Sequence, residues 1–574
     1  MTAGRGGRLA RLREERFDIV VIGGGITGAA TARDAARRGY RTALVEARDF
    51  GEGTSSRSSR LVHGGLRYLE QLELDLVFEA SQERRTLLHL APHMVRPLEF
   101  LFPLYEDGRV GKLKLDAGMW LYDALALFRN IERHQMLDAA GVVEREPQLR
   151  RQGLLGGARY FDAQVDDARL VLATVLGAAE SGAVVANRVQ AVGVEQRDGA
   201  IRGVRVAGAA GRASAADPAS GDPGAQAPGT ETADGWTIPA RLVINATGPW
   251  TDITRSLAGI EGHPLLRPTR GTHIHVRRAR LDHRHALIFE SAVDRRIMFV
   301  LPWGSDLTII GTTDVDFDGD PATVRPTAED VAYLLESANR LFPEAKLRPA
   351  DVVGAWAGLR PLVAEGNAAD EDAVSRDFVI RETPPGLLTI AGGKLTSHRN
   401  MAEKLVDRAA NLLEERFDAP PARECDTARV ALPGGDFEDL DVLREELAAV
   451  AAPYHLPPSS VDRLAAAYGT RARQVLKLLA GRPTLREPLA EDLPYLAAEA
   501  VYASREEMVV HLEDILFRRT HLALETDEGL EEAFRLTARL AGEELGWDAG
   551  RRAREVESAL AERARFDAWR GAGS

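Results

Sequence analysis

Three features are scarce in this sequence, and each scarcity excludes a class of protein. The single cysteine, Cys425, rules out a disulfide within the chain and fits a reducing compartment. Apolar runs are short, and none reaches the roughly 18 residues that a membrane-spanning helix needs. Positive charge is not in excess, and a formal net charge of −13 argues against nucleic acid as a partner.

Clusters of metal ligands are missing as well. The pair His273 and His275 lies in a strand-like run without acidic partners nearby, and the chain has no group of cysteines. Zinc and transition-metal sites need several such donors brought together. We therefore expect no metal site.

The chain has 574 residues, of which 45% are apolar and 28% charged, and this predicts a globular protein with more than one core. Residues 1–16 carry five arginines against two glutamates and lack the apolar core of a signal peptide, so we expect a disordered basic arm. Residues 17–424 mix strands, glycine turns and helices. Helical patterns begin at Asp436, and we assign residues 425–574 to a separate all-helical domain.

A low-complexity stretch interrupts the first part. Residues 207–235 consist almost entirely of Ala, Gly, Ser, Pro, Asp and Thr, which bury too little surface to order themselves. We expect a flexible insertion between two strands of a hairpin, Ile201–Val206 and Trp236–Ile238.

The start of the chain carries a dinucleotide-binding pattern. The apolar strand Phe17–Ile22 leads into Gly23-x-Gly25-x-x-Gly28 and an Ala-rich helix, and a second apolar run ends at Glu46. Gly23 permits a tight turn, Gly25 lets a pyrophosphate approach the backbone, and Gly28 lets the helix pack close to the strand. The helix N-terminus offers free N–H groups to phosphates, and a carboxylate at Glu46 suits a ribose. The pattern serves NAD and FAD alike, and its place near the N-terminus favours a flavoprotein.

Later segments suit the same cofactor. The apolar strand in Ala240–Trp250 ends in Ala246-Thr247-Gly248, small residues that let a cofactor lie against the backbone, as is typical of FAD enzymes. Gly53–Glu70 begins with Ser and Thr side chains that suit phosphates. It continues as His63-Gly64-Gly65-Leu66-Arg67, where the glycines indicate close approach to a flat group. Near residue 390, Gly392-Gly393-Lys394 is placed to reach back to this cofactor. Both ends of the main domain therefore converge on one cofactor, which indicates an enzyme.

Seven segments in a fixed order carry a family resemblance: GGGITGAATARDAARRG, SSRLVHGGLRYLE, INATGPW, RPTRGTHI, LPWGSDLTIIGTTDVDF, AGLRPL and AGGKLTSHR. Together they resemble the FAD-dependent glycerol-3-phosphate dehydrogenases of the aerobic, or respiratory, type. The resemblance covers about residues 17–400 and continues in the helical part with HLEDILFRRTHLALE.

This resemblance implies oxidation of sn-glycerol 3-phosphate to dihydroxyacetone phosphate by FAD, with the electrons passed to a membrane quinone. It implies a glutathione-reductase-like α/β Rossmann domain that binds FAD, an α+β substrate domain interleaved with it in residues 17–424, and the helical cap. The FAD-binding residues that it implies are Gly23, Gly25, Ile26, Thr27, Gly28, Glu46, Ser55, Ser56, Ser59, His63, Gly64, Gly65, Val189, Ala246, Thr247, Gly248, Trp250, Gly392, Gly393, Lys394, Leu395 and Thr396.

Five residues in the matching segments are candidates for catalysis. The phosphate of the substrate needs fixed cations, and we assign it to Arg67, Arg360 and Lys394. Hydride transfer from C2 requires the C2 hydroxyl to lose its proton, and His273 is the first candidate base, with His63 the second. The cations offer an alternative, because they lower the pKa of the hydroxyl directly. Lys394 has a second candidate role, in which it stabilises the anionic reduced flavin.

Three other functions remain open. A glycerol-3-phosphate oxidase, with O2 as acceptor, shares the same motifs. A related flavin oxidase of amino or hydroxy acids would use part of the cationic set for a carboxylate. A non-catalytic FAD-binding module would use the helical domain to dock a partner.

A quinone acceptor implies contact with a bilayer. Residues 112–129, KLKLDAGMWLYDALALFR, fit either an interfacial amphipathic helix or a core helix, and Asp116 and Asp123 favour the core helix. We expect a cytoplasmic protein, peripheral on the inner face of the cell membrane, whose basic arm adds attraction to anionic lipid. The helical domain also suggests a homodimer.

Overall fold

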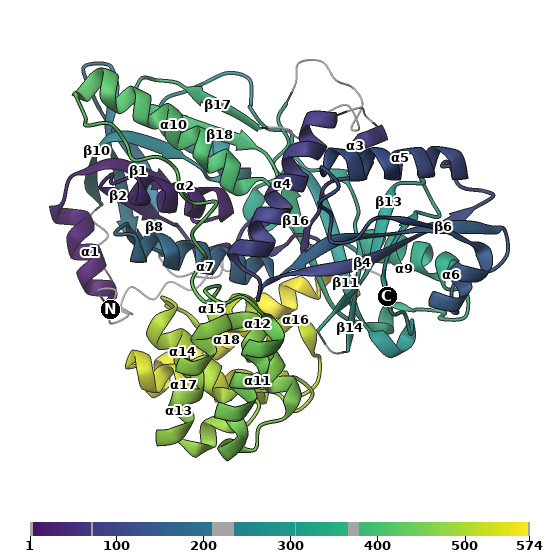
Figure 1. Ribbon diagram of the computed structural model, residues 1–574. Coiled ribbons are helices and arrows are strands. Elements are labelled where there is room, and N and C mark those ends of the chain that lie inside the picture. The colour runs from purple at the N-terminus through teal and green to yellow at the C-terminus, as the bar shows by residue number, and fades with distance from the viewer. Residues whose placement is uncertain (1–3, 71–72, 209–234, 305, 365–377, 572–574) are drawn as a thin grey trace.

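The computed structural model describes residues 4–70, 73–208, 235–304, 306–364 and 378–571, with the backbone alone for Arg67 and Glu70. Figure 1 shows a first sheet with helices α2 and α10, a second sheet beside it, and a helical domain below both. This arrangement confirms the predicted fold class, an α/β Rossmann domain with an α+β domain and an all-helical domain. Among the described helices, none combines the length and the apolar character that crossing a bilayer requires.

The first sheet is the dinucleotide-binding sheet. Its parallel strands lie in the order β18-β10-β1-β2-β7, and β17 adds an antiparallel edge. These strands are β1 (Phe17–Ile22), β2 (Thr42–Val45), β7 (Val184–Ala186), β10 (Trp236–Asn245), β17 (Phe378–Glu382) and β18 (Leu387–Gly392). Every residue of β1 is buried, as its continuous apolar sequence predicts for a strand covered on both faces. One face is covered by α2 (Ile26–Arg37), α7 (Asp167–Glu180) and α10 (His398–Phe417).

The other face of this sheet carries two elements. Strands β8 (Val189–Arg197) and β9 (Ala200–Gly208) continue antiparallel from β10, and their apolar side chains share a core with β1 and β2. Val204 of β9 pairs with Ile238 of β10, so the expected hairpin forms. Of the predicted insertion, residues 207–235, Ala207 and Gly208 instead end strand β9, and residues 209–234 lie outside the described residues.

The second element on this face corrects the prediction of a disordered arm in residues 1–16. Residues Arg5–Glu14 form helix α1, whose Leu9 and Leu12 are 3% and 0% exposed in the core beneath β1. The guanidinium of Arg13 lies 4.5 Å from the ring centroid of Trp236. The prediction was wrong because it rested on the positive charge of the arginines. Leu9 and Leu12, three residues apart, lie on one face of the helix, and burial of these two side chains suffices to dock that face against the sheet.

The second sheet is mixed and lies beside the first. Its order is β15-β11-β14-β13-β12-β4-β6-β3, with β16 on the free side of β11 and β5 on β6. The strands are β3 (Leu61–Val62), β4 (Val95–Tyr105), β5 (Gln135–Asp138), β6 (Leu154–Val165), β11 (Thr269–Arg277), β12 (Ala286–Glu290), β13 (Ile297–Trp303), β14 (Leu307–Gly311), β15 (Val315–Asp316) and β16 (Val352–Arg360). The helices of this part are α3 (Arg67–Glu70), α4 (Leu74–Leu90), α5 (Lys112–Leu125), α6 (Ala139–Arg145) and α9 (Ala328–Leu341). The short α8 (Thr251–Ser256) follows β10 of the first sheet.

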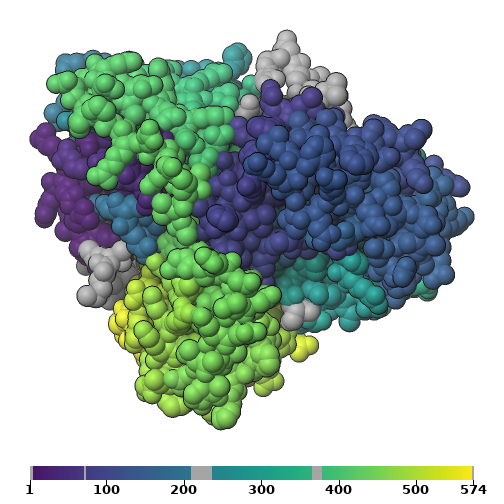
Figure 2. Space-filling model, in the orientation of Figure 1, coloured from purple at the N-terminus to yellow at the C-terminus, as the bar shows by residue number. Residues whose placement is uncertain are grey.

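The C-terminal part is a helical domain whose buried core is continuous with that of the second sheet. Figure 2 shows it as the green-to-yellow lobe, joined to α10 by a narrow green segment. Its helices are α11 (Leu440–Ala451), α12 (Pro458–Tyr468), α13 (Ala472–Gly481), α14 (Ala497–Glu506), α15 (Leu512–Asp514), α16 (Leu522–Glu525), α17 (Leu530–Leu545) and α18 (Ala549–Phe566), with a π-helical turn at Ile515–Arg519.

Buried ion pairs join this domain to the first sheet. Asp49, fully buried just after β2, accepts hydrogen bonds from Arg518 and Arg519 of the π-helical turn. Two further pairs, each at 2.7 Å, are Arg188–Asp514 and Arg169–Glu507. A buried charge that loses its partner costs about 3–5 kcal/mol, so together these pairs stabilise the contact between the two parts.

The helix α1 can be tested by hydrogen–deuterium exchange. We expect the backbone amides of residues 5–14 to be protected, and Leu12→Ala to speed their exchange about 30-fold or more, since truncating a buried leucine costs about 2–5 kcal/mol. Arg11→Ala is the control in the same helix, because Arg11 is exposed and, among the described residues, forms its ion pair with Glu15 of the same segment. Wild-type amides that exchange as fast as those of an unfolded chain would contradict the helix.

Candidate active site

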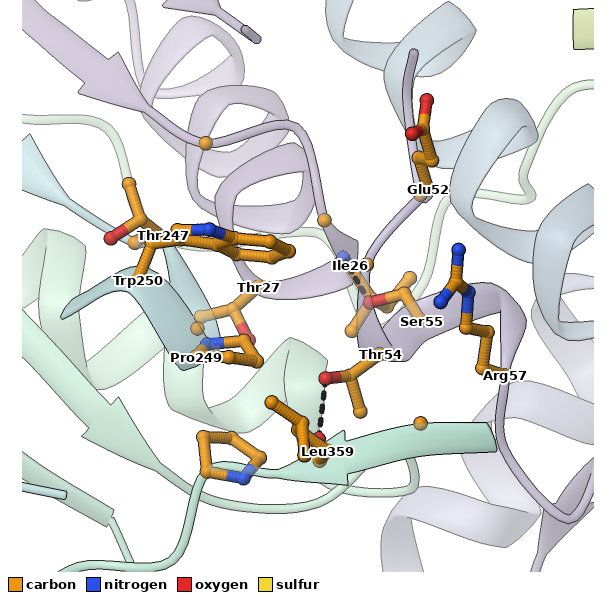
Figure 3. Close-up of a pocket in the computed structure, with 18 of the residues that line it drawn as sticks. Ile26, Thr27, Glu52, Thr54, Ser55, Arg57, Thr247, Pro249, Trp250 and Leu359 are labelled. Carbon is orange, nitrogen blue, oxygen red and sulfur yellow. Dashed lines mark hydrogen bonds between the residues drawn. The ribbon is translucent and has the colours of Figure 1, made fainter. Parts of the chain in front are cut away.

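A cavity of about 560 Å³ lies where the carboxyl ends of β1, β10 and β18 meet β11 and β16. The β1–α2 turn, the segment after β2 and the segment after β10 line one part of it. His273, Arg360 and Lys394 line another part. Figure 3 shows Trp250, Pro249 and Thr247 on one side of this space, and Thr54, Ser55 and Arg57 on another. In open sheets of this kind, ligands bind beyond the carboxyl ends of the parallel strands.

The glycine turn is built for a cofactor that lies close to the backbone. Gly23 has a φ of 107°, and a Cβ there would lie 2.6 Å from the carbonyl oxygen of Ala246. A Cβ on Gly28 would collide with the carbonyl oxygen of Gly23, so α2 packs against β1 only because residue 28 is glycine. Ser55 Oγ accepts a hydrogen bond of 3.1 Å from the backbone N–H of Ile26 in the first turn of α2 (Figure 3). These features fit a dinucleotide whose pyrophosphate sits at the N-terminus of α2.

Glu46 also lines the cavity, and its carboxylate holds the local backbone. It accepts hydrogen bonds from the N–H groups of Gly24, at 2.6 Å, and Arg48, at 2.7 Å. Burial raises the pKa of Glu46 above its usual value, and these two hydrogen bonds oppose that rise. A carboxylate has about four lone-pair sites, so Glu46 retains acceptor capacity for a ribose.

His273 is presented by β11 in a buried setting. Its Nε2 lies 2.8 Å from Ser59 Oγ, and its ring stacks on Trp356 with 5.2 Å between centroids. Its Nδ1 has no hydrogen-bond partner among the described residues. Burial lowers the pKa of His273 well below 6.5, and the positive charges of Arg360 and Arg60 lower it further. The ring is therefore neutral at neutral pH and can accept a proton.

Arg360 is the last residue of β16, opposite Thr269 of β11, and neighbouring residues hold its guanidinium in place. Its Nη1 lies 2.9 Å from Asp314 Oδ1, and its Nη2 donates to Thr312 Oγ1 at 3.1 Å and to the carbonyl oxygen of Thr313 at 3.0 Å. The Thr312-Thr313-Asp314 segment therefore orients this arginine, a role that the sequence did not reveal.

The segments around His63 and Lys394 meet in space, as their glycines predict. The N–H of His63 donates to Thr396 Oγ1 at 3.3 Å, and both residues line the cavity. Lys394 Nζ lies 3.4 Å from the ring centroid of Tyr68, which follows the glycine pair. Gly392 and Gly393 both have positive φ, which shapes the turn that carries Lys394.

The structure places most of the predicted cofactor residues on the cavity wall. The residues that line it are Gly23, Gly25, Ile26, Thr27, Glu46, Ser55, Ser59, His63, Val189, Ala246, Thr247, Gly248, Trp250, Gly392, Gly393, Lys394, Leu395 and Thr396. Gly28, Ser56, Gly64 and Gly65 lie behind the described wall. The N–H of Gly64 points to Tyr122 and Asp162, each at 3.1 Å, and a Cβ on Gly65 would overlap the ring of Tyr68. The side chain of Arg67 lies outside what the structure describes.

Several lining residues were not predicted. Arg48 lines the cavity two residues after Glu46, with its guanidinium 5.2 Å from the ring centroid of Trp250. Arg57 and Ser58 lie between the serines that were predicted, and Thr54 Oγ1 donates to the carbonyl oxygen of Leu359 at 2.5 Å (Figure 3). Their proximity to predicted residues was the available signal. The described part of the chain holds no group of His, Cys, Asp and Glu side chains that could bind a metal ion.

Comparison with known families and proteins agrees with this geometry. The family model for FAD dependent oxidoreductases matches residues 18–408, and that for the C-terminal domain of alpha-glycerophosphate oxidase matches residues 425–552. Glycerol-3-phosphate dehydrogenase 2 of Mycobacterium tuberculosis is 40% identical over 96% of this chain and 88% of its own length. The aerobic glycerol-3-phosphate dehydrogenase of Staphylococcus saprophyticus is 35% identical over 89% of this chain and 87% of its own.

A solved structure extends the likeness to three dimensions. The glycerol-3-phosphate dehydrogenase of Bacillus halodurans, complexed with FAD, superposes with a TM-score of 0.77 at 30% identity, over 98% of this chain and 97% of its own. The L-alpha-glycerophosphate oxidase of Mycoplasma pneumoniae, at 18% identity and a TM-score of 0.53, shares the fold over 73% of this chain and 99% of its own. The chain belongs to the FAD-dependent glycerol-3-phosphate dehydrogenase family.

Proposed function

We propose that this protein oxidises sn-glycerol 3-phosphate to dihydroxyacetone phosphate with FAD and passes the electrons to a membrane quinone. The proposal rests on one observation. The cavity that begins at the glycine turn of the dinucleotide site is also lined by His273, Arg360 and Lys394. A cofactor site, a proton acceptor and two cations thus share one enclosed space. The relatives at 35–40% identity are named glycerol-3-phosphate dehydrogenases, and we infer the substrate of this protein from those names.

The described residues fit FAD, and they divide the chemistry between them. Bound FAD supplies the acceptor for the hydride that leaves C2 of the substrate. The ring of His273, which its lowered pKa keeps unprotonated, takes the proton of the C2 hydroxyl. The same shift weakens it as a base, and the nearby cations offset this because they lower the pKa of the hydroxyl. Arg360 binds the phosphate while Asp314 and Thr312 hold its orientation. Lys394 adds the second positive charge.

An oxidase with O2 as acceptor is the main alternative, since the helical domain matches a family model named after such an oxidase. The relatives at 35–40% identity, however, are named dehydrogenases, whereas the oxidase structure is only 18% identical. We therefore favour the quinone.

An exposed apolar surface on and around α5 supports contact with a bilayer. One face of the helix is buried through Leu115, Met119 and Tyr122, as a core helix requires. The other face exposes apolar side chains that continue into the following turn and neighbouring α4. They are Leu113 (86%), Trp120 (52%), Leu121 (37%), Leu127 (49%), Phe128 (52%), Ile131 (37%), Leu74 (37%) and Phe78 (42%).

The same segment supplies positive charge beside this surface. Lys112 and Lys114 open α5, and Arg129 and Arg133 follow it. Apolar side chains with flanking cations are typical of a peripheral membrane contact. We propose that this surface rests on the inner face of the cell membrane. The homodimer stays a prediction.

The role of Arg360 predicts a defect in substrate binding. Loss of a charge-assisted hydrogen bond costs about 1.5–3 kcal/mol, so Arg360→Gln should raise the sn-glycerol 3-phosphate concentration for half-maximal anaerobic flavin reduction about 10- to 150-fold. Arg267→Gln is the control, because its exposed pair with Asp316 lies outside the cavity wall. Equal half-maximal concentrations in wild type and Arg360→Gln would contradict the assignment, and a wild-type flavin that the substrate does not bleach would contradict the function.

The pKa of His273 predicts the pH profile. Because the folded-state pKa lies well below 6.5, protonation of His273 should leave the rate of flavin reduction unchanged between about pH 6.5 and 8 and reduce it only at lower pH. His273→Asn should slow flavin reduction about 10²- to 10⁴-fold while half-saturation changes little. The measurement is stopped-flow reduction across pH. An acidic limb centred near pH 6.5 that disappears in His273→Asn would show an unshifted pKa.

The membrane proposal predicts binding to lipid vesicles. Purified protein should co-sediment with vesicles that contain anionic lipid, and Trp120→Glu should weaken this binding about tenfold or more, since burying a large apolar side chain contributes about 1.5–3 kcal/mol. Val442→Glu places the same charge on an exposed valine (53%) of the helical domain and should leave binding unchanged. An equal loss of vesicle binding in both variants would contradict the proposed membrane-binding surface.

A further inference from the structure

A segment of the helical domain lies directly behind the reaction end of the cavity without lining it. Helix α16 (Leu522–Glu525) packs against β16, where a Cβ on Gly354 would overlap the carbonyl oxygen of Leu524. That same oxygen accepts a hydrogen bond of 2.9 Å from Nδ1 of His275, two residues after His273 on β11. The strands that carry His273 and Arg360 therefore rest on α16.

Glu525 at the end of α16 reaches an enclosed layer of aromatic rings. Its Oε1 accepts from the indole N–H of Trp303 at 2.5 Å, and its Oε2 accepts from the hydroxyl of Tyr495 at 2.6 Å. Its Oε1 also lies 3.8 Å from Nη1 of Arg60. Burial alone raises the pKa of Glu525, but His521, His275 and Arg60 bring it below its usual value, so the carboxylate is ionised at neutral pH.

Arg60 is the cation that Glu525 balances. It is 1% exposed, and its guanidinium lies 3.9 Å from the ring centroid of Trp303 and 5.0 Å from that of Trp356. Its Nη2 donates to Nδ1 of His521 at 3.5 Å. A buried guanidinium between two indoles gains cation–π stabilisation, yet it still needs a negative charge nearby to offset desolvation.

Arg60 and Trp356 in turn support both contacts of His273. The ring of Trp356 stacks on His273 at an interplanar angle of 11°, and its Nε1 donates to the carbonyl oxygen of Ser58 at 3.3 Å. The N–H of Arg60 donates to Ser58 Oγ at 2.9 Å, and Ser59, between them, pairs with His273 Nε2. The stacking partner of His273, Trp356, and its hydrogen-bond partner, Ser59, thus both depend on the layer of aromatic rings around Arg60.

We propose that Glu525 is a positioning residue for the reaction: through Arg60 and Trp356 it fixes the ring of His273 and the Ser58–Ser59 turn. The helical domain is then a part of the active site that acts from behind its wall. The effect on rate rests on the proposed function, because it requires His273 to act on the substrate. The effect on the position of His273 does not.

The test pairs two substitutions that each remove one negative charge from the same interface. Glu525→Gln should slow anaerobic flavin reduction at saturating sn-glycerol 3-phosphate about tenfold or more, with half-saturation within about twofold. Glu507→Gln is the matched control, because Glu507 pairs with Arg169 and, among the described contacts, touches neither Arg60 nor Trp356. It should lower the melting temperature and leave the rate within about twofold. Equal rates in both variants would overturn the proposal.

Crystal structures test the positioning role of Glu525 independently of turnover. In a crystal structure of the Glu525→Gln holoenzyme, we expect the Ser58–Arg60 turn and the His273 ring to be displaced from their wild-type positions, whereas the Glu507→Gln structure should keep both. An unmoved His273 in Glu525→Gln would refute the positioning role. If wild-type flavin is not reduced by sn-glycerol 3-phosphate, the proposed function fails, and the crystal structures still decide the positioning role.

Discussion

The buried charges between the helical domain and the first sheet are the constraint on which the arrangement depends. Asp49 follows β2 and lies in the segment that also lines the cofactor cavity, and its partners Arg518 and Arg519 come from the far end of the chain. Charges at such depth tolerate few alternative geometries, because each needs its counter-charge within hydrogen-bond reach. The ion pairs that dock the helical domain therefore also anchor the segment after β2, part of which lines the cavity.

The cavity then unites two kinds of chemistry on two sheets. The parallel sheet supplies glycines and a helix N-terminus, features that suit the binding of phosphate by the backbone. The mixed sheet supplies His273 and Arg360 on neighbouring strands, with Asp314 and Thr312 behind the arginine. Strands hold these groups in place, as the proposed roles of His273 and Arg360 require.

Much of this could be predicted from sequence, because glycine spacing and apolar runs reflect local geometry. The turn at Gly23–Gly28 and the helices of the C-terminal domain follow such local rules. The approach of His63 to Thr396 joins residues 333 positions apart, and it was predicted because both segments carry glycine pairs suited to the same cofactor. Helix α1 was missed because its docking depends on two leucines whose partners lie far along the chain. The ion pair of Arg360 with Asp314 could not be predicted for the same reason, since the spacing of residues along the chain does not determine which side chains pair across strands.

The identity of the electron acceptor is the claim that separates a dehydrogenase from an oxidase on this scaffold. The most direct measurement reduces the purified flavoprotein with sn-glycerol 3-phosphate without oxygen and then mixes it rapidly with either a soluble quinone analogue or aerated buffer. Our account predicts fast return of the oxidised flavin absorbance with the quinone analogue and slow return in air. Fast reoxidation by air, with no advantage for the quinone, would contradict it and identify an oxidase.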